Sequence, residues 1–424
     1  MSGRLSISGV REVLRNRDFT LFTVGAFFSH TGDWAQRLAI GWITWELTRS
    51  PAWLGIILFA DLAPTLVLSP IGGAVADRYD RLWLARVTLW CALAHPVVLA
   101  ALYFTGLLNI WLLLLAAIYH GVASAFGQSA RLAMTALIVS ERDISRAMPI
   151  GSISFNMARF AGPALFGLIV VVASPGYAIA FNAAMYLVFA VILHFVHLRD
   201  EPIDKSRDRH LLVESLHGIR YALTHPGIGP LLVVLVVSSL GSRAFLDLLP
   251  GFADEVFGRG PEALSIMTSA TALGALAGGI YLLLRASIAG LAGISMAWSM
   301  LIGVGLIAFT MTDAFWLAVP ILFFVGCGLS ISATGVLTLA QSSVRGEMRG
   351  RVLSTYGIIF RGGPALGGLL MGWIAEWTGL RWPVAGGGLL CVLIWLWVVG
   401  KLPRLRRVLE VEGPDRALPL EDRT

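Results

Sequence analysis

Seven charged side chains lie inside long apolar stretches of this 424-residue sequence, and they are the residues best able to do chemistry. A charge at membrane depth is costly, so it usually faces a water-filled cavity or a partner of opposite sign. A carboxyl group in such a place can take up and release a proton, and a guanidinium group can hold carboxylate or catecholate oxygens in bidentate geometry. The seven are Asp33, Arg37, Asp61, Arg159, Arg243, Asp247 and Arg361.

The carboxyl groups differ in their neighbours along the chain. Asp33 and Arg37 stand four residues apart, so they can touch on one helix. Arg243 and Asp247 repeat this spacing in reverse order, and either pair can equally be a self-neutralising structural bridge. Asp61 has no basic residue within one turn. Asp33 and Asp61 are therefore the candidates for proton coupling, although Asp61 can instead bond a neighbouring helix or lie near the outer interface.

The basic and amide side chains are candidates for substrate binding. Four arginines stand against three aspartates at membrane depth, which predicts an anionic or catechol-bearing substrate rather than a cationic drug. The alternative is that Arg159 and Arg361 only brace the structure, and that amides such as Asn182 bond neighbouring helices. The candidates for substrate binding are Arg37, Arg159, Arg243, Arg361, Gln36 and Asn156.

The histidines His30, His95 and His120 show no metal-ligand spacing, and we interpret them as structural or interfacial. Neither of the two lysines, Lys205 and Lys401, lies in a phosphate-binding loop. No Ser-His or His-Asp arrangement indicates catalysis. We therefore expect no metal, no cofactor, no enzymatic activity and no nucleic-acid partner.

The composition places these residues in a membrane. The chain is 57% hydrophobic and 14% charged, whereas an ordinary soluble domain carries about 25% charge. A helix needs about 20 apolar residues to cross a bilayer. Twelve runs meet this length or come close to it: Phe19–Leu47, Ala52–Ala76, Leu82–Phe104, Leu108–Ala130, Ile150–Ala173, Tyr177–Leu198, Ile228–Pro250, Ala263–Leu284, Gly290–Met311, Ala314–Ala340, Val352–Trp377 and Trp382–Val399.

A polar break and an internal repeat divide the runs into six plus six. Arg159 is followed by Gly-Pro-Ala-Leu in the fifth run, and Arg361 is followed by the same four residues in the eleventh. Paired Gly/Pro interruptions are typical of transporters built from repeats. We predict an all-α membrane protein with twelve transmembrane helices in two pseudo-symmetric six-helix bundles around a central cavity. The predicted parts are an N-terminal bundle (1–198), a cytoplasmic linker with an amphipathic helix (199–226), a C-terminal bundle (227–400) and a disordered cytoplasmic tail (401–424).

The positions of the basic residues set the orientation. Only Arg49, Arg259 and Arg381 of the 32 basic residues fall in loops on the side opposite the N-terminus. Lys and Arg concentrate on the cytoplasmic side of membrane proteins. We therefore expect a multi-pass protein of the cell (plasma or inner) membrane with both termini in the cytoplasm.

The stretch Gly73-Ala-Val-Ala-Asp-Arg-Tyr-Asp-Arg81, between the second and third runs, closely resembles the corresponding loop of major facilitator superfamily transporters. Gly73 would let two helices approach closely, and Asp77 would accept from free N–H groups at a helix start. The segments Ser29–Arg37 and Asn156–Pro163 resemble the enterobactin-exporter and macrolide-efflux branch, as does the segment Glu347–Val352.

This resemblance implies a secondary active transporter, most often a proton-coupled exporter of small organic molecules such as a siderophore-like anion or a drug. The partners would be the substrate, protons and the bilayer, and we expect a monomer. In related transporters the Asp of this loop docks on the start of the eleventh span. The implied gating residues are Gly73, Asp77, Arg78, Arg81, Arg349, Gly350 and Arg351. The alternatives are a lysolipid or lipid flippase of the same fold and a non-transporting membrane receptor.

Overall fold

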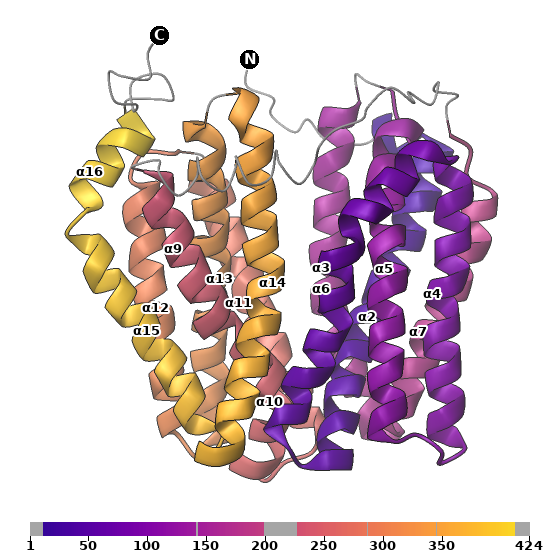
Figure 1. Cartoon of the computed structure of the whole chain (residues 1–424), viewed down its shortest axis with the longest axis horizontal. Helices are drawn as coiled ribbons and strands as arrows, with labels where there is room; N and C mark the ends of the chain where they lie inside the picture. The colour runs from indigo at the N-terminus through magenta and orange to yellow at the C-terminus, as the bar shows by residue number, and fades with distance from the viewer. Residues whose placement is uncertain (1–11, 141–142, 199–226, 286, 345, 412–424) are drawn as a thin grey trace. The chain divides into compact units, whose positions relative to one another are not determined.

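A computed structural model describes residues 12–140, 143–198, 227–285, 287–344 and 346–411. These residues form helices joined by short turns, with no β-strand among them (Figure 1). The expected amphipathic helix in the linker and the last part of the tail lie outside the described residues. So do the side chains of Asp77, Arg349 and Arg351.

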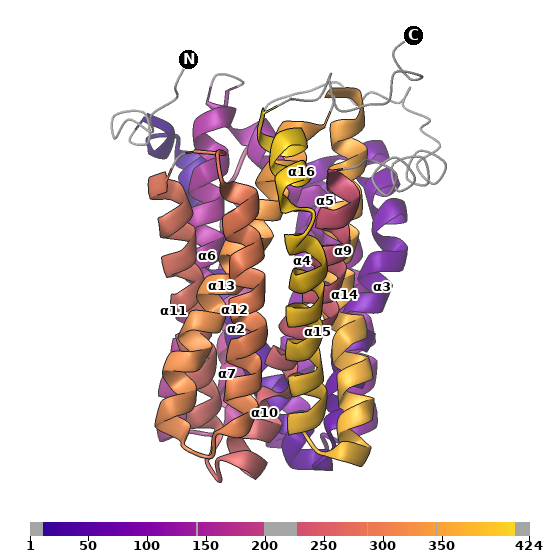
Figure 2. The same cartoon turned by 90° about the vertical axis from the view of Figure 1, so that its left-hand side faces the viewer.

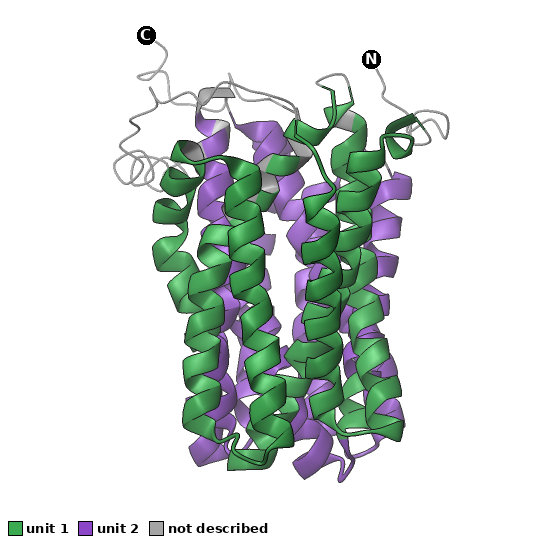
Figure 3. Cartoon of the chain, turned by 90° about the vertical axis from the view of Figure 1, so that its right-hand side faces the viewer, with its two compact units in different colours: residues 1–48, 60–208, 261–265 green, residues 49–59, 209–260, 266–424 purple. Residues whose placement is uncertain are grey.

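Two compact units make up the chain, and Figure 3 colours them separately. Unit 1 contains Met1–Thr48, Ala60–Asp208 and Pro261–Ser265, and unit 2 contains Arg49–Phe59, Arg209–Gly260 and Ile266–Thr424. The first six long helices are α2 (Arg17–Thr48), α3 (Pro51–Arg78), α4 (Arg81–Phe104), α5 (Ile110–Ile138), α6 (Ile144–Val172) and α7 (Pro175–His194).

The second half of the chain begins with an irregular span. The helix α9 (Ile228–Ser238) continues into a π-turn, Ser239–Arg243, and a 3-10 turn, Ala244–Leu248. The short α10 (Leu249–Gly251) and a second π-turn, Phe252–Val256, complete it. The remaining helices are α11 (Pro261–Arg285), α12 (Leu291–Met311), α13 (Phe315–Ser343), α14 (Gly346–Thr378), α15 (Arg381–Val399) and α16 (Leu402–Arg406), followed by the π-turn Arg407–Val411.

The same packing scheme recurs in the two halves. In the first, α2 packs on α6 and α7, while α4 packs on α5 and α7. In the second, the irregular seventh span packs on α14 and α15, while α12 packs on α13 and α15, as Figure 2 shows for the last three. Each helix therefore has its counterpart six spans later, as expected of a fold built from repeats.

Eleven helices of the described part are long and apolar enough to cross a membrane. The remaining long helix, α2, has the length but carries His30, Asp33, Gln36 and Arg37 in its middle. These polar groups lower its hydropathy, and they mark it as the helix with chemistry to perform. The predicted all-helical membrane fold is confirmed.

The turn between α3 and α4 differs from the expectation. The helix α3 runs through Arg78, so Asp77 lies in its last turn and not at a helix start. Asp80 is the residue that caps α4, because its side chain accepts from the backbone N–H of Trp83 at 2.6 Å. Sequence alone did not distinguish the two aspartates, since both precede an arginine in the same short stretch.

The close helix contact expected at Gly73 lies one residue earlier. A Cβ added at Gly72 would collide with the backbone of Ala125 and Phe126 on α5, whereas a Cβ added at Gly73 meets nothing within 4 Å. Gly72 is therefore the glycine that lets α3 and α5 approach. Successive helical residues are 100° apart, so only one of two adjacent glycines can face a given neighbour.

The first part of the tail is ordered as helix, contrary to the expected disorder. The side chains of Leu405 and Leu409 are buried. The carboxylate of Glu410 accepts from the backbone N–H groups of Gly290 and Ala292, at 2.6 and 2.9 Å. An acid at the free N–H groups of a helix start is favourable, so this contact fastens the tail to α12.

Candidate functional site

A buried row of amides begins on the polar helix α2. The amide nitrogen of Asn182 on α7 donates to Gln36 Oε1 at 2.9 Å, and it lies 3.5 Å from Asp33 Oδ1. The amide nitrogen of Gln36 in turn lies 3.2 Å from Nδ1 of His95 on α4. Gly32 makes room for this row, because a Cβ there would collide with Asn182. Gln36 and Asn182 therefore bond neighbouring helices, which is the alternative that the sequence left open.

Asp61 has a basic partner from another helix. Nδ1 of His120 on α5 lies 2.6 Å from Asp61 Oδ1, and Nε2 of His120 lies 3.4 Å from the hydroxyl of Ser124 one turn further on. The rings of His120 and His95 are stacked at a tilt of 32°, with centroids 4.8 Å apart. Sequence reasoning missed this pair because Asp61 and His120 are 59 residues apart. The available signal was a histidine inside an apolar run, two runs after the one that carries Asp61.

Asp33 occupies a more open position than the amide row. Its side chain is 33% exposed, and Nδ1 of His30 lies 3.8 Å from its Oδ2. The contacts of Asp33 include His30 on its own helix, and Asn182 and Tyr186 on α7. The predicted contact of Asp33 with Arg37 stays a prediction.

Two arginines share one indole ring on unit 1. The guanidinium carbon of Arg37 lies 5.7 Å from the ring centre of Trp34, and that of Arg159 on α6 lies 5.4 Å from it. Arg37 is exposed, Arg159 is half-buried, and Asn156 is exposed one turn before Arg159. The amide nitrogen of Asn156 donates to the carbonyl of Ser152 on its own helix. We call Trp34, Arg37, Asn156 and Arg159 the paired-arginine surface.

On this surface Arg159 lies beside a second positive charge. Like charges repel, and the two guanidinium groups are near enough to act on each other. Within the described residues, no carboxylate forms an ion pair with Arg159; its ring contact with Trp34 holds it instead. An anion bound beside Trp34 would therefore lower the electrostatic energy of both arginines.

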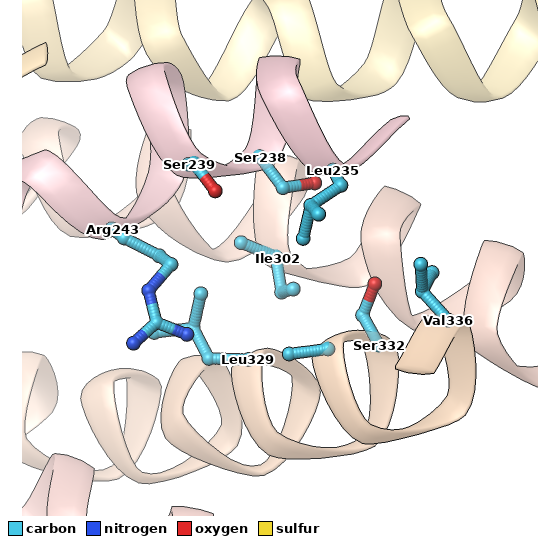
Figure 4. A pocket seen from close by; sticks show the side chains of 9 residues that line it. Leu235, Ser238, Ser239, Arg243, Ile302, Leu329, Ser332 and Val336 are labelled. Atoms are coloured by element: carbon cyan, nitrogen blue, oxygen red, sulfur yellow. The ribbon is translucent and has the colours of Figure 1, made fainter. Parts of the chain in front are cut away.

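Unit 2 contains a small pocket of a different character. The residues that line it are Leu235, Ser238, Ser239, Arg243, Ile302, Leu329, Ser332, Ala333 and Val336, most of which Figure 4 labels. The Ser332 hydroxyl lies 2.8 Å from that of Ser299. Among the described residues, the buried hydroxyls of Ser238 and Ser239 have no hydrogen-bond partner. The pocket can thus offer hydroxyl groups to a water molecule or a polar ligand.

Arg243 lies at one end of this pocket. Its guanidinium carbon lies 4.0 Å from the ring centre of Phe360 on α14. Arg243 ends a π-turn and Asp247 stands on the 3-10 turn that follows, and their predicted pairing stays a prediction. Arg361, next to Phe360, is exposed.

The structure describes the side chains of two proposed gating arginines, Arg78 and Arg81. Arg78 is exposed at the end of α3, Arg81 is half-buried at the start of α4, and Gly350 lies in the first turns of α14. Among the described residues, no group of three His, Cys, Asp or Glu side chains is arranged to hold a metal ion.

Comparisons with known proteins agree on the kind of molecule. The profile of the transmembrane secretion effector family, within the major facilitator superfamily, matches residues 11–413. The staphyloferrin A transporter of Staphylococcus aureus is 23% identical over 388 residues, which cover 91% of this chain and 97% of that protein. Macrolide efflux protein A of Streptococcus pyogenes is 24% identical over 381 residues, covering 87% and 92%. A solved D-xylose–proton symporter has the same fold, with a TM-score of 0.67 and 13% identity over 90% of this chain and 97% of that chain.

Proposed function

We propose that this chain, which belongs to the transmembrane secretion effector family of the major facilitator superfamily, exports a small organic anion in exchange for protons. Membership makes it a multi-pass membrane transporter of a small-molecule substrate. The similar proteins include transporters named for staphyloferrin A and for macrolides. The proposal adds the charge of the substrate, the direction of transport and the coupling ion.

The paired-arginine surface carries the proposal. Two guanidinium groups flank Trp34, and the exposed Arg37 and Asn156 lie in the middle of their spans. Exposed polar groups at membrane depth would be costly in lipid, so they must face water or a bound ligand. Guanidinium groups bind carboxylate oxygens in bidentate geometry, and an indole face can cover the apolar part of an organic anion. Arg243 and Arg361 stay the proposed substrate-binding arginines of unit 2.

Electrostatics also favours the outward direction for such a substrate. An inside-negative membrane potential contributes about 2.3 kcal/mol per elementary charge per 100 mV. Moving an anion outward and a proton inward are both downhill in this potential. A transporter that exchanges the two therefore uses the potential twice, with Asp33 and Asp61 as the proposed proton-binding carboxyl groups.

The same proposal includes alternating access and its inner gate. The proposed gate consists of the segment Gly73–Arg81, at the end of α3 and the start of α4, and the start of α14 with Arg349, Gly350 and Arg351. Asp77→Asn should then slow turnover while the affinity for substrate stays nearly intact. Wild-type turnover in this variant would remove Asp77 from the gate.

The experiment for the main proposal uses purified chain in liposomes with a trapped pH-sensitive dye. The probes are staphyloferrin A, a macrolide and a lipophilic cation. We expect transport of staphyloferrin A, the anionic probe, to move protons across the membrane in the opposite direction. The variant Arg159→Gln should lose this proton flux. Arg146→Gln is the matched control, because Arg146 lies on the same helix in an exposed ion pair with Glu12 that contributes little to stability. Flux of cations alone, unaffected by Arg159→Gln, would contradict the proposal.

Orientation is tested by labelling. In a cysteine-free background, Arg259→Cys should react with a membrane-impermeant thiol reagent added to whole cells, since Arg259 is exposed in a loop that the charge pattern predicts to be outside. Arg78→Cys should react only after the membrane is opened. The reverse pattern would place both termini outside the cytoplasm. Labelling of the solubilised protein at both positions is the control for access.

A further inference from the structure

We propose that His120 and Asp61 together form the proton-binding site of this transporter, with the proton held on Nε2 of His120. The inference rests on the proposed proton coupling and names the residues that perform it. It assigns to His120 a role that the sequence gave no reason to expect. The neighbouring groups Ser124, His95 and Gln36 adapt this pair to one proton.

Both ring nitrogens of His120 have a hydrogen-bond partner in both protonation states of the ring. Its Nδ1 lies 2.6 Å from the Asp61 carboxylate, which can only accept, so Nδ1 carries a hydrogen and donates. Its Nε2 lies 3.4 Å from the Ser124 hydroxyl, which can both donate and accept. When Nε2 is bare, Ser124 donates to it; when Nε2 holds the proton, Ser124 accepts. Neither state leaves a ring nitrogen unsatisfied, so proton uptake requires only a rotation of one hydroxyl.

The adjacent histidine, His95, does not take part in proton binding, because its hydrogen bond with Gln36 holds it in the neutral form. Asn182 donates to Gln36 Oε1, so the Gln36 amide nitrogen faces Nδ1 of His95 and donates to it. A nitrogen that accepts a hydrogen bond carries no proton, and His95 is therefore held in its neutral form with its hydrogen on Nε2. The His95 ring is buried and stacked against His120 at 4.8 Å. A second positive charge at that distance would repel the first, so the amide row limits the site to one proton.

Charged side chains on the surrounding helices also act on Asp61 and His120. On α2, Arg37 acts on Asp61, and Asp33 acts on His120; on α5, Arg131 acts on His120. On α4, His95 is the titratable neighbour, and on α3 Asp61 itself is the counter-ion. Arg37 belongs to the paired-arginine surface. The proton site and the surface proposed for the substrate therefore share one electrostatic field, through which occupation of one can influence the other.

A spectroscopic experiment tests the site without any substrate. The full chain, labelled with ¹⁵N-histidine, is placed in lipid nanodiscs and followed by NMR between about pH 5 and about pH 9, the range in which histidines titrate. We expect one histidine, absent from the spectrum of His120→Gln, to gain a proton on Nε2 while Nδ1 stays protonated. His95 should not titrate. Asp61→Asn should displace the transition by about one pH unit or more.

Transport measurements then connect the site to coupling. In liposomes, with staphyloferrin A as the probe, His120→Gln should lower pH-driven flux by about tenfold or more and leave substrate exchange at equal pH within about threefold. His194→Gln is the matched control, because His194 lies in the same bundle, where its Nδ1 bonds the carbonyl of Ala190 and its ring contacts Trp90. Retained exchange shows that the variant is folded.

The outcomes separate this inference from the proposed function. If wild-type protein shows no pH-driven flux of any probe, the proposed function fails, and the NMR transition still decides whether His120 binds the proton. If wild-type flux is pH-driven and His120→Gln keeps it, the inference is wrong while the function stands. A His120 ring that does not change over the whole pH range, or titration of His95 in its place, would also overturn the inference.

Discussion

The N-terminal unit brings titratable side chains together at membrane depth, whereas the polar groups that line the pocket of the C-terminal unit are hydroxyls and one guanidinium. Asp61, His120 and His95 meet in the first. Ser238, Ser239 and Arg243 line the second. The two halves share one packing scheme, so the backbone does not dictate this division. A repeat fold can place different chemistry at corresponding depths because the side chains, and not the helix contacts, decide it.

The difference has a physical consequence. A group that stores a proton must exist in two charge states, and each state needs partners that make its burial affordable. Serine hydroxyls have a single charge state and can only reorient. Coupling is therefore expected to depend on unit 1 and to be insensitive to unit 2.

The repeated Gly-Pro-Ala-Leu motifs, which begin three residues after Arg159 and two residues after Arg361, show the same division in detail. In unit 1, a Cβ added at Gly162 would collide with Trp34 and the backbone of α2. In unit 2, a Cβ added at the corresponding Gly363 would meet Ser239. The same glycine thus sets the distance to the aromatic ring of the paired-arginine surface in one half, and to a serine of the pocket in the other.

We expect the largest effect on pH-driven flux when the aspartates of the two units are compared. Asp61→Asn should reduce pH-driven flux by about tenfold or more, because it removes the counter-ion of His120. Asp33→Asn should have a smaller effect, and Asp247→Asn in unit 2 should have none. The measurement is flux into liposomes with and without a pH gradient. Equal losses in Asp61→Asn and Asp247→Asn would abolish the distinction between the units.

The second comparison concerns the two arginines that precede the repeated Gly-Pro-Ala-Leu motifs, Arg159 and Arg361. Arg159→Gln should weaken binding of the anionic probe by about tenfold or more, since a hydrogen bond to a charged group contributes about 1.5–3 kcal/mol. Arg361→Gln should weaken it less, because the exposed Arg361 is not part of the paired-arginine surface. Equilibrium binding to protein in nanodiscs measures both. A larger loss in Arg361→Gln would move the main anion contact to unit 2.

A third comparison uses the two glycines of the repeated motif. Gly162→Ala and Gly363→Ala should each destabilise the protein by about 1–3 kcal/mol, the usual cost of overpacking. Only Gly162→Ala should also weaken anion binding, because it displaces Trp34. Thermal unfolding and ligand binding on the same samples separate the two effects. Unchanged binding in Gly162→Ala would show that Trp34 does not orient the arginines.

We expect the smallest effect on pH-driven flux when two serines, one from each unit, are compared. Ser124→Ala removes the partner of His120 Nε2 and should lower pH-driven flux by about threefold, in line with the modest worth of a neutral hydrogen bond. Ser332→Ala removes a hydroxyl of the unit 2 pocket, while Ser299 keeps its bond to the carbonyl of Ser295 at 3.1 Å. This second variant should leave the pH response unchanged. A pH response altered by Ser332→Ala would extend proton handling to unit 2.

The sequence by itself determined the fold class and the family. Apolar runs of bilayer length predicted the helices, and the loop before the third run predicted the superfamily; both are confirmed. Hydropathy suffices for this because every backbone group in a bilayer must be satisfied within a helix. The sequence also named Arg37 and Asn156 as candidates for substrate binding, and the structure shows both side chains exposed. Polar groups at membrane depth are costly in lipid, so such residues are expected to face water or a ligand.

The tertiary structure decided which polar groups meet. Asp61 and His120 are 59 residues apart, and the Trp34 ring lies beside arginines of two helices. It also decided that Gly72 and not Gly73 makes the close approach. Spacing along one helix predicts contacts only within that helix. The rotation of each helix about its axis depends on packing against its neighbours, so the partner of a side chain on another helix is set only when the bundle is assembled.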